Sequence, residues 1–507
     1  MKRIILFLLA PLVCGSVVAQ DPSPDATFDF DGYRTTRRDC TDYNTGNAIC
    51  VQSDGKILVA GISGPQSTIA RVVRYHTDGT TDLSFGVDGV AQIDLSESTG
   101  PGSCVVNDMK LQSDGKIVIA GQGRIAGGTA IAVARFDTTG FPDSTFNYIG
   151  LLYKEVFVGE TGSAQALAIQ SNGKIVVAGY AFDGNHTQMH VHRFNSDGTD
   201  DVTFDGDGRV VMSSAMYAST GRCMAIQPDG KIVVAGERSY TSVDAAVWRF
   251  NTNGSPDAGF DNDGVAYYNF GSTENIYAVA VQPDGKLVVG GFHGYFMNYL
   301  VMRVDAAGVL DSSFSMDGYI SIDFAGDNDW LEEISIQPDD KILCIGHGAN
   351  GTAQMARLYS NGDYDPNFDF DGLYTVTFED NSDFRAHTFQ SDGKLLVCGQ
   401  ASNSTTHFLL VARYKIDYEV GIPESAQNVF SISPNPFTAS FVIQRSNPDG
   451  DAVLNLYNAA GTLVRSQTVR GPSAVVDRRD LAAGVYVAEL REENGNASRI
   501  RIVAAGE

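Results

Sequence analysis

The chain has 507 residues, of which 43% are hydrophobic, and its formal net charge is −25. This length is enough for more than one domain. The acidic charge argues against nucleic acid and anionic membrane surfaces as partners, because both require a basic patch on the protein.

Residues 1–19 are predicted to be a secretory signal peptide, in which two basic residues and an apolar run lead to a cleavage signal at Val17-Val18-Ala19. Cys14 would suggest a lipoprotein instead, but Val13 stands before it, where a small residue is expected. No other stretch approaches the roughly 18 apolar residues of a membrane span. We therefore expect a soluble, exported chain, whose formal charge falls from −25 to −27 when the two basic residues are lost.

One pattern returns seven times between residues 20 and 418. A Gln-x-Asp-Gly-Lys segment, or a close variant, is followed by an apolar run that closes on a glycine, at Gly61, Gly121, Gly179, Gly236, Gly291, Gly346 and Gly399. Each unit also has an Asp-x-x-Phe motif and an arginine after a later apolar run, and we expect each arginine to pair with the Asp of the next motif. Spacings of 53 to 60 residues are typical of an array whose units cannot bury their apolar faces alone.

Four short β-strands are predicted in each unit. Alternating segments such as 167–170 and β-branched runs such as 174–179 flank an Asp-Gly turn, where glycines such as Gly230 are expected at positive φ. Four antiparallel strands repeated radially form a β-propeller blade. The sequence therefore predicts an all-β fold with a seven-bladed β-propeller over residues 20–418.

The two ends of the array are predicted to meet. The seventh unit ends at Arg413-Tyr414-Lys415 without the Asp-x-x-Phe that follows each earlier arginine, and residues 25–28 at the start of the chain supply the missing motif. We expect this segment to complete the last blade and close the ring, which removes an exposed sheet edge. A linear solenoid is the alternative, but it would require polar caps that the sequence lacks.

The repeat ends after Lys415, and residues 419–430 are predicted to be a linker. Residues 431–507 then show short alternating strands separated by turn residues, which is the pattern of a small, Ig-like β-sandwich.

Three motifs of this C-terminal region resemble those of a known family. Pro434-Asn435-Pro436, Tyr457-Asn458 with Gly461, and Gly484-Val485-Tyr486 are similar to the motifs of the type A C-terminal sorting domain of the type IX secretion system. The resemblance covers residues 431–507. It implies contact with that secretion machinery, export across the outer membrane of a Bacteroidota-type cell, and release from the surface or attachment to it.

The seven units resemble the delta-60 repeat family, a bacterial propeller-type repeat built on the same Gln-x-Asp-Gly-Lys run. That family has no established activity, so the resemblance implies a fold and not a function.

Six cysteines remain in the mature chain. Cys40 and Cys50 lie on adjacent predicted strands and could form a disulfide in an oxidising compartment. Cys344 and Cys398 lie in the buried-strand motif and are expected to be free core thiols.

Two patterns suggest metal binding. Asp-x-Asp-Gly sequences place two carboxylates before a glycine, as calcium loops do, at Asp205 and Asp207, Asp261 and Asp263, and Asp369 and Asp371. The alternative, which we favour, is an Asp-Gly turn with a solvated neighbour, and no other cofactor is expected. His190 and His192 alternate on one strand and could bind a metal, but no acidic ligand stands at a suitable spacing. His387 occupies an apolar position of the repeat, so we expect a core histidine there.

Counted from the Asp-x-x-Phe motif that opens each unit, the loops after the first and third strands vary in length and composition, whereas the other turns are repeated. Antiparallel pairing places the variable loops on one face of the disc, and binding sites favour such loops on a rigid scaffold. The candidate ligand contacts are Tyr295, Tyr299 and Trp330, because aromatic rings suit both sugars and peptides. The alternative is that these rings only pack the loops.

These observations favour a secreted or cell-surface binding protein that engages a glycan or a protein. The runner-up is an extracellular hydrolase or lyase with its site at the propeller channel, and a third hypothesis is a purely structural surface protein. The common motifs of nucleophilic, zinc-dependent and phosphate-binding catalysis are missing from the sequence. Catalysis is therefore the less favoured hypothesis. It is not excluded, because a site assembled from several blades would leave no motif.

Overall fold

The structure is a computed structural model that describes residues 22–36, 44–63, 68–97, 104–212, 214, 216–324, 328–416, 430–433, 437, 439–445, 451–458, 463–478, 481, 484–492 and 497–504. Regular secondary structure in these residues consists of β-strands alone, so no helix among them is long and apolar enough to cross a membrane. The chain divides into two compact units, with the boundary between Asp417 and Tyr418. The predicted signal peptide and nearly all of the predicted linker lie outside the described residues.

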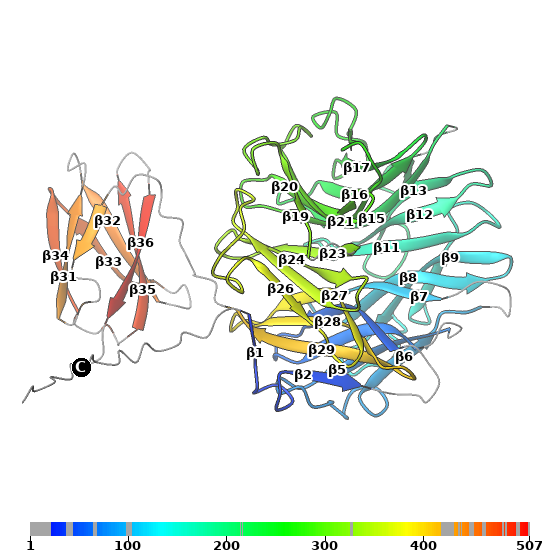
Figure 1. The fold of residues 1–507 in the computed structure, drawn as a ribbon, viewed down its shortest axis with the longest axis horizontal. Coiled ribbons are helices and arrows are strands. Elements are labelled where there is room, and N and C mark those ends of the chain that lie inside the picture. Colours follow the sequence, from blue (N-terminus) through cyan, green and yellow to red (C-terminus); the bar gives the residue numbers. More distant parts are fainter. Residues whose placement is uncertain are drawn as a thin grey trace, which may run out of the picture. The chain divides into compact units, whose positions relative to one another are not determined.

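Seven antiparallel sheets, the blades, make up the first unit (Figure 1). Blades 1 to 3 are β3 (Asn44–Val51), β4 (Ile57–Ser63), β5 (Ile69–Tyr75) and β6 (Val90–Asp94); β7 (Val105–Leu111), β8 (Ile117–Ile125), β9 (Gly128–Phe136) and β10 (Leu151–Lys154); and β11 (Gly162–Ile169), β12 (Ile175–Phe182), β13 (Thr187–Phe194) and β14 (Arg209–Met212).

Blades 4 to 6 are β15 (Ala218–Ile226), β16 (Ile232–Ser239), β17 (Val243–Phe250) and β18 (Val265–Tyr268); β19 (Glu274–Val281), β20 (Leu287–His293), β21 (Asn298–Val304) and β22 (Tyr319–Ile322); and β23 (Asp329–Ile336), β24 (Ile342–Gly348), β25 (Ala353–Leu358) and β26 (Leu373–Val376). Blade 7 consists of β27 (Asn381–Phe389), β28 (Leu395–Ser402) and β29 (His407–Lys415), completed by β1 (Ser23–Pro24) and β2 (Tyr33–Thr36).

The ring is closed by the N-terminal segment. β1 and β2 pair with β29, with Ser23 opposite Lys415 and Tyr33 opposite Ala412, and Figure 1 shows β2 beside β29. The first strand of each blade packs against the preceding blade, and β3 packs in the same way against β27, β28 and β29. The prediction of a closed seven-bladed ring is therefore confirmed, and the linear solenoid is excluded.

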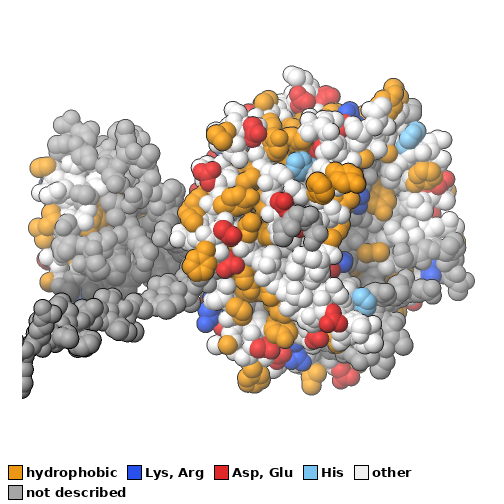
Figure 2. All heavy atoms as spheres, viewed as in Figure 1, with side chains coloured by type: hydrophobic (Ala, Val, Ile, Leu, Met, Phe, Trp, Pro, Cys, Tyr) orange, Lys and Arg blue, Asp and Glu red, His pale blue; other side chains and the backbone are white. Residues whose placement is uncertain are grey.

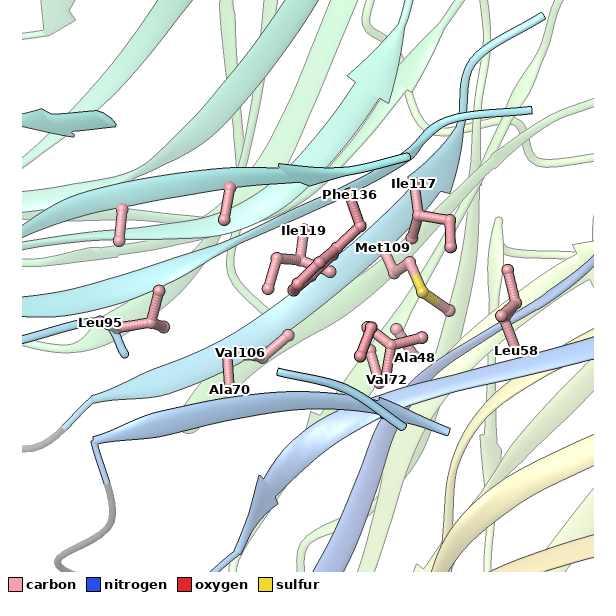
Figure 3. Close-up of a cluster of buried hydrophobic side chains, with 14 of the residues drawn as sticks. Ala48, Leu58, Ala70, Val72, Leu95, Val106, Met109, Ile117, Ile119 and Phe136 are labelled. Carbon is pink, nitrogen blue, oxygen red and sulfur yellow. The ribbon is translucent and has the colours of Figure 1, made fainter. Parts of the chain in front are cut away.

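Apolar side chains from neighbouring blades pack together between the sheets. Between blades 1 and 2, Leu58 and Val72 form one buried cluster with Met109, Ile119 and Phe136 (Figure 3). Full burial of such a side chain contributes about 1.5–3 kcal/mol. Each blade is thus stabilised by both of its neighbours, which is why a single unit could not fold alone.

Four residues of each unit, hereafter the stitching residues, join one blade to the next. In blade 1, Arg74 Nε donates to Asp82 Oδ2 at 2.8 Å, and its guanidinium lies 4.3 Å from the centre of the Phe85 ring. Lys56 approaches the same carboxylate at 3.2 Å, and Arg74 Nη1 donates to Thr138 O of blade 2. The predicted Arg–Asp pair occurs in all seven blades, at 2.6 to 2.9 Å. In blade 7 the acid is Asp25, so the closing segment carries the seventh copy.

The glycines of the repeated Asp-Gly turns lie at positive φ, as expected, with Gly230 at +85°. Gly294, in a variable loop, lies at +83°, so a backbone that excludes other residues is not confined to the repeated turns.

The second unit is a sandwich of two sheets. One consists of β30 (Phe430–Ser433), β31 (Ser440–Arg445) and β34 (Ser473–Asp477); the other consists of β32 (Ala452–Asn458), β33 (Leu463–Val469), β35 (Gly484–Glu492) and β36 (Ala497–Ala504). Phe441, Ile443, Leu454, Leu456 and Leu490 form its buried core. The predicted β-sandwich is confirmed.

Candidate functional site in the central channel

The first strand of every blade contains a β-bulge at the same position. In blade 1 the pairing passes from Gly46 opposite Gly61 to Ala48 opposite Ala60, so Asn47 is the extra residue. The same shift occurs in the other six blades. The seven extra residues, hereafter the bulge residues, are Asn47, Asn107, Gln165, Arg222, Tyr277, Glu332 and Arg385, and all are half-buried.

The closing glycine of each repeat lies opposite its bulge. A Cβ at Gly61 would lie 1.8 Å from Thr45 O, and at the other six closing glycines it would lie 1.9, 2.0, 2.0, 1.8, 1.9 and 2.1 Å from the equivalent carbonyl oxygen. Only a residue without a side chain permits this approach. The bulge therefore explains the glycine that defines the repeat, and the glycine marks the bulge in the sequence.

The bulge residues line a channel at the centre of the ring. All seven contribute to the wall of a cavity of about 160 Å³, together with Asp108, Lys110 and Glu333 of the same strands. Seven equivalent backbone positions hold five residue types. The channel is therefore asymmetric, although the scaffold around it is repeated.

Blades 1 to 3 present amides, hereafter the amide arc: Asn47, Asn107 and Gln165. Asn47 Nδ2 donates to Val106 O at 2.8 Å, and Asn107 Nδ2 donates to Ala164 O at 2.7 Å. Each of these bonds reaches the main chain of the next blade. Two of the three amides thus join neighbouring blades, which is a structural role.

Blades 4 to 7 present Arg222, Tyr277, Glu332 and Arg385, hereafter the ionisable arc. In three of these blades the bulge residue contacts the residue 15 positions later, on the second strand of its own blade. Arg222 Nη2 donates to Glu237 Oε1 at 2.7 Å, the rings of Tyr277 and Phe292 stack at 5.8 Å, and Glu332 Oε1 lies 3.6 Å from His347 Nδ1. These contacts orient the side chains along the channel wall.

Glu332 is the most perturbed group of the ionisable arc. Burial raises the pKa of its carboxyl to about 7, while Arg385 lowers it and Asp383 raises it further. The side chain is only 27% exposed, because the channel that it faces is surrounded by protein. Burial also lowers the pKa of His347. A carboxyl whose pKa is raised to about 7 and an imidazole whose pKa is lowered therefore face each other in the channel.

The other charges of the channel are held in pairs. Arg385 Nη2 donates to Asp383 Oδ2 at 3.0 Å, and Lys110 Nζ donates to Asp108 Oδ1 at 2.6 Å. Burial alone would raise the pKa of Glu333, but His387, whose Nδ1 lies 2.9 Å away, outweighs it and lowers the pKa. His387 is buried, as predicted for a core histidine.

The three predicted ligand contacts fall into different environments. Tyr295 is 90% exposed in the loop between β20 and β21. Trp330, half-buried near the start of β23, stacks on His347 at 5.2 Å. Tyr299 is 0% exposed and packs against Phe324 inside the sheet stack. Its prediction as a ligand contact is corrected, because β21 begins at Asn298 and turns this ring into the core.

The predicted metal ligands take part in other contacts. Asp207, Asp263 and Asp371 each accept a hydrogen bond from the backbone N–H two residues later, while Asp205, Asp261 and Asp369 lie at positive φ. His190 and His192 are buried with their Nδ1 atoms 3.4 Å apart, and burial lowers the pKa of both, that of His190 to about 4. Across the described ranges, no cluster of three or more His, Cys, Asp or Glu is arranged to hold a metal ion.

Several remaining expectations concern single residues. Cys344 and Cys398 are buried and free, as predicted, and Cys50 is also free, whereas Cys40 lies outside the described residues. Gly484 lies in β35 and Tyr486 is buried in the core of the second unit. Pro434, Asn435 and Pro436 lie outside the described residues.

Sequence reasoning missed the bulge residues, although a signal for them exists. Each stands five positions before the Gln of the repeated turn, as Glu332 stands before Gln337. At this position of the repeat, a polar or aromatic residue interrupts a mostly apolar strand, and its type changes from unit to unit. A comparison of the seven units by column, instead of by motif, would have found it.

Comparison with known proteins identifies both units. A domain of unknown function (DUF5122) that forms a β-propeller matches residues 52–85, 112–146, 170–204, 227–260 and 282–314. A secretion system C-terminal sorting domain matches residues 431–504. No curated protein matches the chain. The protein is thus a β-propeller repeat protein with a type IX sorting domain, and it is exported by that system to the cell surface or the medium.

Several solved structures are similar to the chain at low identity. PorZ, a surface component of the type IX secretion system of Porphyromonas gingivalis, is 14% identical with a TM-score of 0.41, over 92% of this chain and 60% of PorZ. An ulvan lyase of family PL25 is 12% identical (TM-score 0.46, 76% and 96% of the two chains). A Dyadobacter fermentans protein of unknown function is also 12% identical (TM-score 0.39, 76% and 98%). The chain thus spans about 60% of the length of PorZ, and none of these similarities bears on a ligand.

Proposed function

We propose that the propeller is a binding module that engages an extracellular glycan or protein through its variable-loop face, at the mouth of the central channel. The observation that carries this proposal is the ionisable arc. A scaffold that repeats seven times needs only one residue type at each equivalent position, yet the bulge residues of blades 4 to 7 depart from the amides of blades 1 to 3. Departures from a repeated pattern without a structural reason are typical of functional sites.

The geometry at the mouth supports this placement. Trp330 comes two residues before Glu332 on the same strand, at the end where the variable loops lie. The neighbouring loop, which carries Tyr295, is joined to that strand because Asp329 N donates to Met297 O at 3.1 Å. An exposed aromatic ring and a half-buried one thus come from adjacent blades on the variable-loop face, and aromatic residues with a polar tip are frequent in binding hot spots.

Screening the mature chain on glycan and protein arrays tests the proposal. Once a ligand is found, Tyr295→Ala and Trp330→Ala should each weaken binding by at least about tenfold, or about 1.4 kcal/mol, with little change in melting temperature. Tyr148→Ala is the matched control, because Tyr148 is equally exposed but lies in a repeated turn of the opposite face. Full affinity in both channel-mouth variants would move the site elsewhere.

A second candidate function is hydrolysis or lysis of an extracellular polysaccharide in the channel. The observation that favours it is that Glu332 and His347 face each other, and that the pKa of Glu332 is raised to about 7. Groups that titrate near the working pH are suited to general acid–base catalysis. Release of reducing ends from a polysaccharide panel, lost in Glu332→Gln, would support catalysis, whereas tight binding without product would leave a binding module.

A further inference from the structure

The charges of the channel leave no cation for an acidic ligand. Lys110, Arg222 and Arg385 each have a carboxylate partner of their own, at 2.6, 2.7 and 3.0 Å. The two remaining acids that line the cavity, Glu332 and Glu333, face imidazoles. Asp and Glu side chains are also scattered over the visible face of the propeller, with few Lys or Arg among them (Figure 2). An anionic ligand would therefore meet net repulsion on approach and no free positive charge on arrival.

Every blade contributes a polar or aromatic bulge residue to the lining of the channel. The bulge residues include three amides, two guanidinium groups and one carboxyl, which together offer both donors and acceptors. Arg222 engages Glu237 through Nε and Nη2, which are two of its three nitrogens. Purely apolar ligands would make no hydrogen bonds to the donors and acceptors that these groups still present to the channel, and would remove them from water. Hydroxyl groups, which both donate and accept, match such a lining.

Aromatic rings lie close to the ionisable arc. The Trp330 ring stacks on His347, next to Glu332, and the Tyr277 ring forms part of the wall in the neighbouring blade. Rings of this kind provide flat apolar area beside polar groups. The site therefore offers an aromatic surface together with a dense set of hydrogen-bonding groups.

The position of the cavity limits how a ligand enters it. Its volume is about 160 Å³ and its wall includes a bulge residue from each of the seven blades. Because the blades surround the cavity, a chain-like ligand enters it end first, along the channel.

We infer that the central channel binds the terminal, uncharged sugar unit of a glycan, held by the ionisable arc and approached past Trp330. This inference rests on the proposed binding function and specifies its ligand. A glycan is favoured over a protein, because six of the seven bulge residues are polar and one sugar unit presents several hydroxyl groups to them at once, which no single amino-acid side chain does.

Saturation-transfer NMR with the mature chain tests the inference. The probes are neutral tetrasaccharides of glucose, xylose, mannose and N-acetylglucosamine, an oligogalacturonate and a basic peptide. We expect at least one neutral probe to bind with its terminal unit closest to the protein. Glu332→Gln and Tyr277→Ala should weaken that binding at least tenfold, with Tyr148→Ala unchanged and with the melting temperature recorded for each variant.

Other outcomes overturn the inference in distinguishable ways. Preference for the oligogalacturonate or the peptide, contact through internal sugar units, or full affinity in both channel variants would refute the channel site while leaving a binding module in place. Binding to none of these probes, together with blank glycan and protein arrays, would refute the proposed function as well.

Discussion

Two sets of residues occur once per blade in this propeller, and they differ in how much they vary. The stitching residues are the same in all seven blades: an arginine, an aspartate, a phenylalanine and a lysine. The bulge residues occupy equally repeated backbone positions but hold five residue types. The stitching residues must fit one geometry seven times, whereas the bulge residues face a channel that imposes no such requirement. Identity across blades therefore indicates a shared structural role, whereas difference shows that the scaffold does not fix the bulge residues.

The largest expected effect is acid unfolding through the stitching aspartates. The pKa of all seven is lowered in the folded protein. For Asp25, burial alone would raise the pKa, but hydrogen bonds from Thr27 and the charges of Lys394 and Arg413 outweigh it and lower the pKa from 3.8 to about 2.

A carboxyl whose pKa is lower in the folded than in the unfolded protein stabilises the fold at pH values above its unfolded pKa. This stabilisation is lost as the pH falls through its folded pKa. Asp25 alone contributes about 2 kcal/mol in this way. Seven such residues together are comparable to the 5–15 kcal/mol of a typical domain. The urea midpoint should therefore fall steeply between pH 4 and pH 2, and a flat profile there would show that the stitching residues contribute little.

Breaking the ring closure should have the next largest effect. Arg413→Met leaves the buried Asp25 with lysines as its only cationic partners among the described residues, and loss of one member of a buried pair costs about 3–5 kcal/mol. Arg34→Met is the control, because Arg34 forms a more exposed pair with Asp29 in the same segment, and such pairs contribute about 0–1 kcal/mol. Urea unfolding measures both, and equal losses would mean that closure does not depend on the buried pair.

A side chain at a closing glycine should destabilise the fold by about 1–3 kcal/mol. In Gly346→Ala the new Cβ would lie 1.9 Å from Trp330 O, and a backbone atom cannot move aside as a side chain can. Gly162→Ala, also within a strand, would meet its nearest neighbour at 3.6 Å. The melting temperature of Gly346→Ala should fall well below that of Gly162→Ala, and similar values would contradict the bulge geometry.

The smallest expected effect is a gain in stability. Phe370 is 75% exposed and lies at a φ of +70°, where most residues are strained. Blade 4 has Asn262 at the equivalent position, at +67°. Phe370→Asn should therefore raise the free energy of unfolding by about 0.5 kcal/mol, and a loss would indicate that this ring makes stabilising contacts.

Much of the fold could be predicted from the sequence, because its determinants are local and repeated. The Asp-Gly turns and the Asp-x-x-Phe motifs gave the number of blades and the closing role of Asp25. The channel could not be predicted in this way. A bulge breaks the two-residue alternation of a strand, so the strand predicted from alternation over 167–170 stops short of Gln165. Alternation also predicts a loop at Tyr299, because the start of a strand depends on pairing with its neighbour.

The contrast between the two sets is tested most directly by two carboxylate-to-amide variants. Glu332 has a raised pKa, so its charge costs stability above pH 4.5, and the full cost is present above about pH 7. Glu332→Gln should remove that cost and gain about 1–3 kcal/mol at pH 8, with no change at pH 4.

Asp143→Asn leaves Arg135 and Lys116 without their shared carboxylate and should lose about 3 kcal/mol at pH 8. Urea unfolding of both variants at pH 8 is therefore predicted to give changes of opposite sign. A loss of stability in both would contradict the account, because the channel carboxyl would then hold the ring together like the stitching residues.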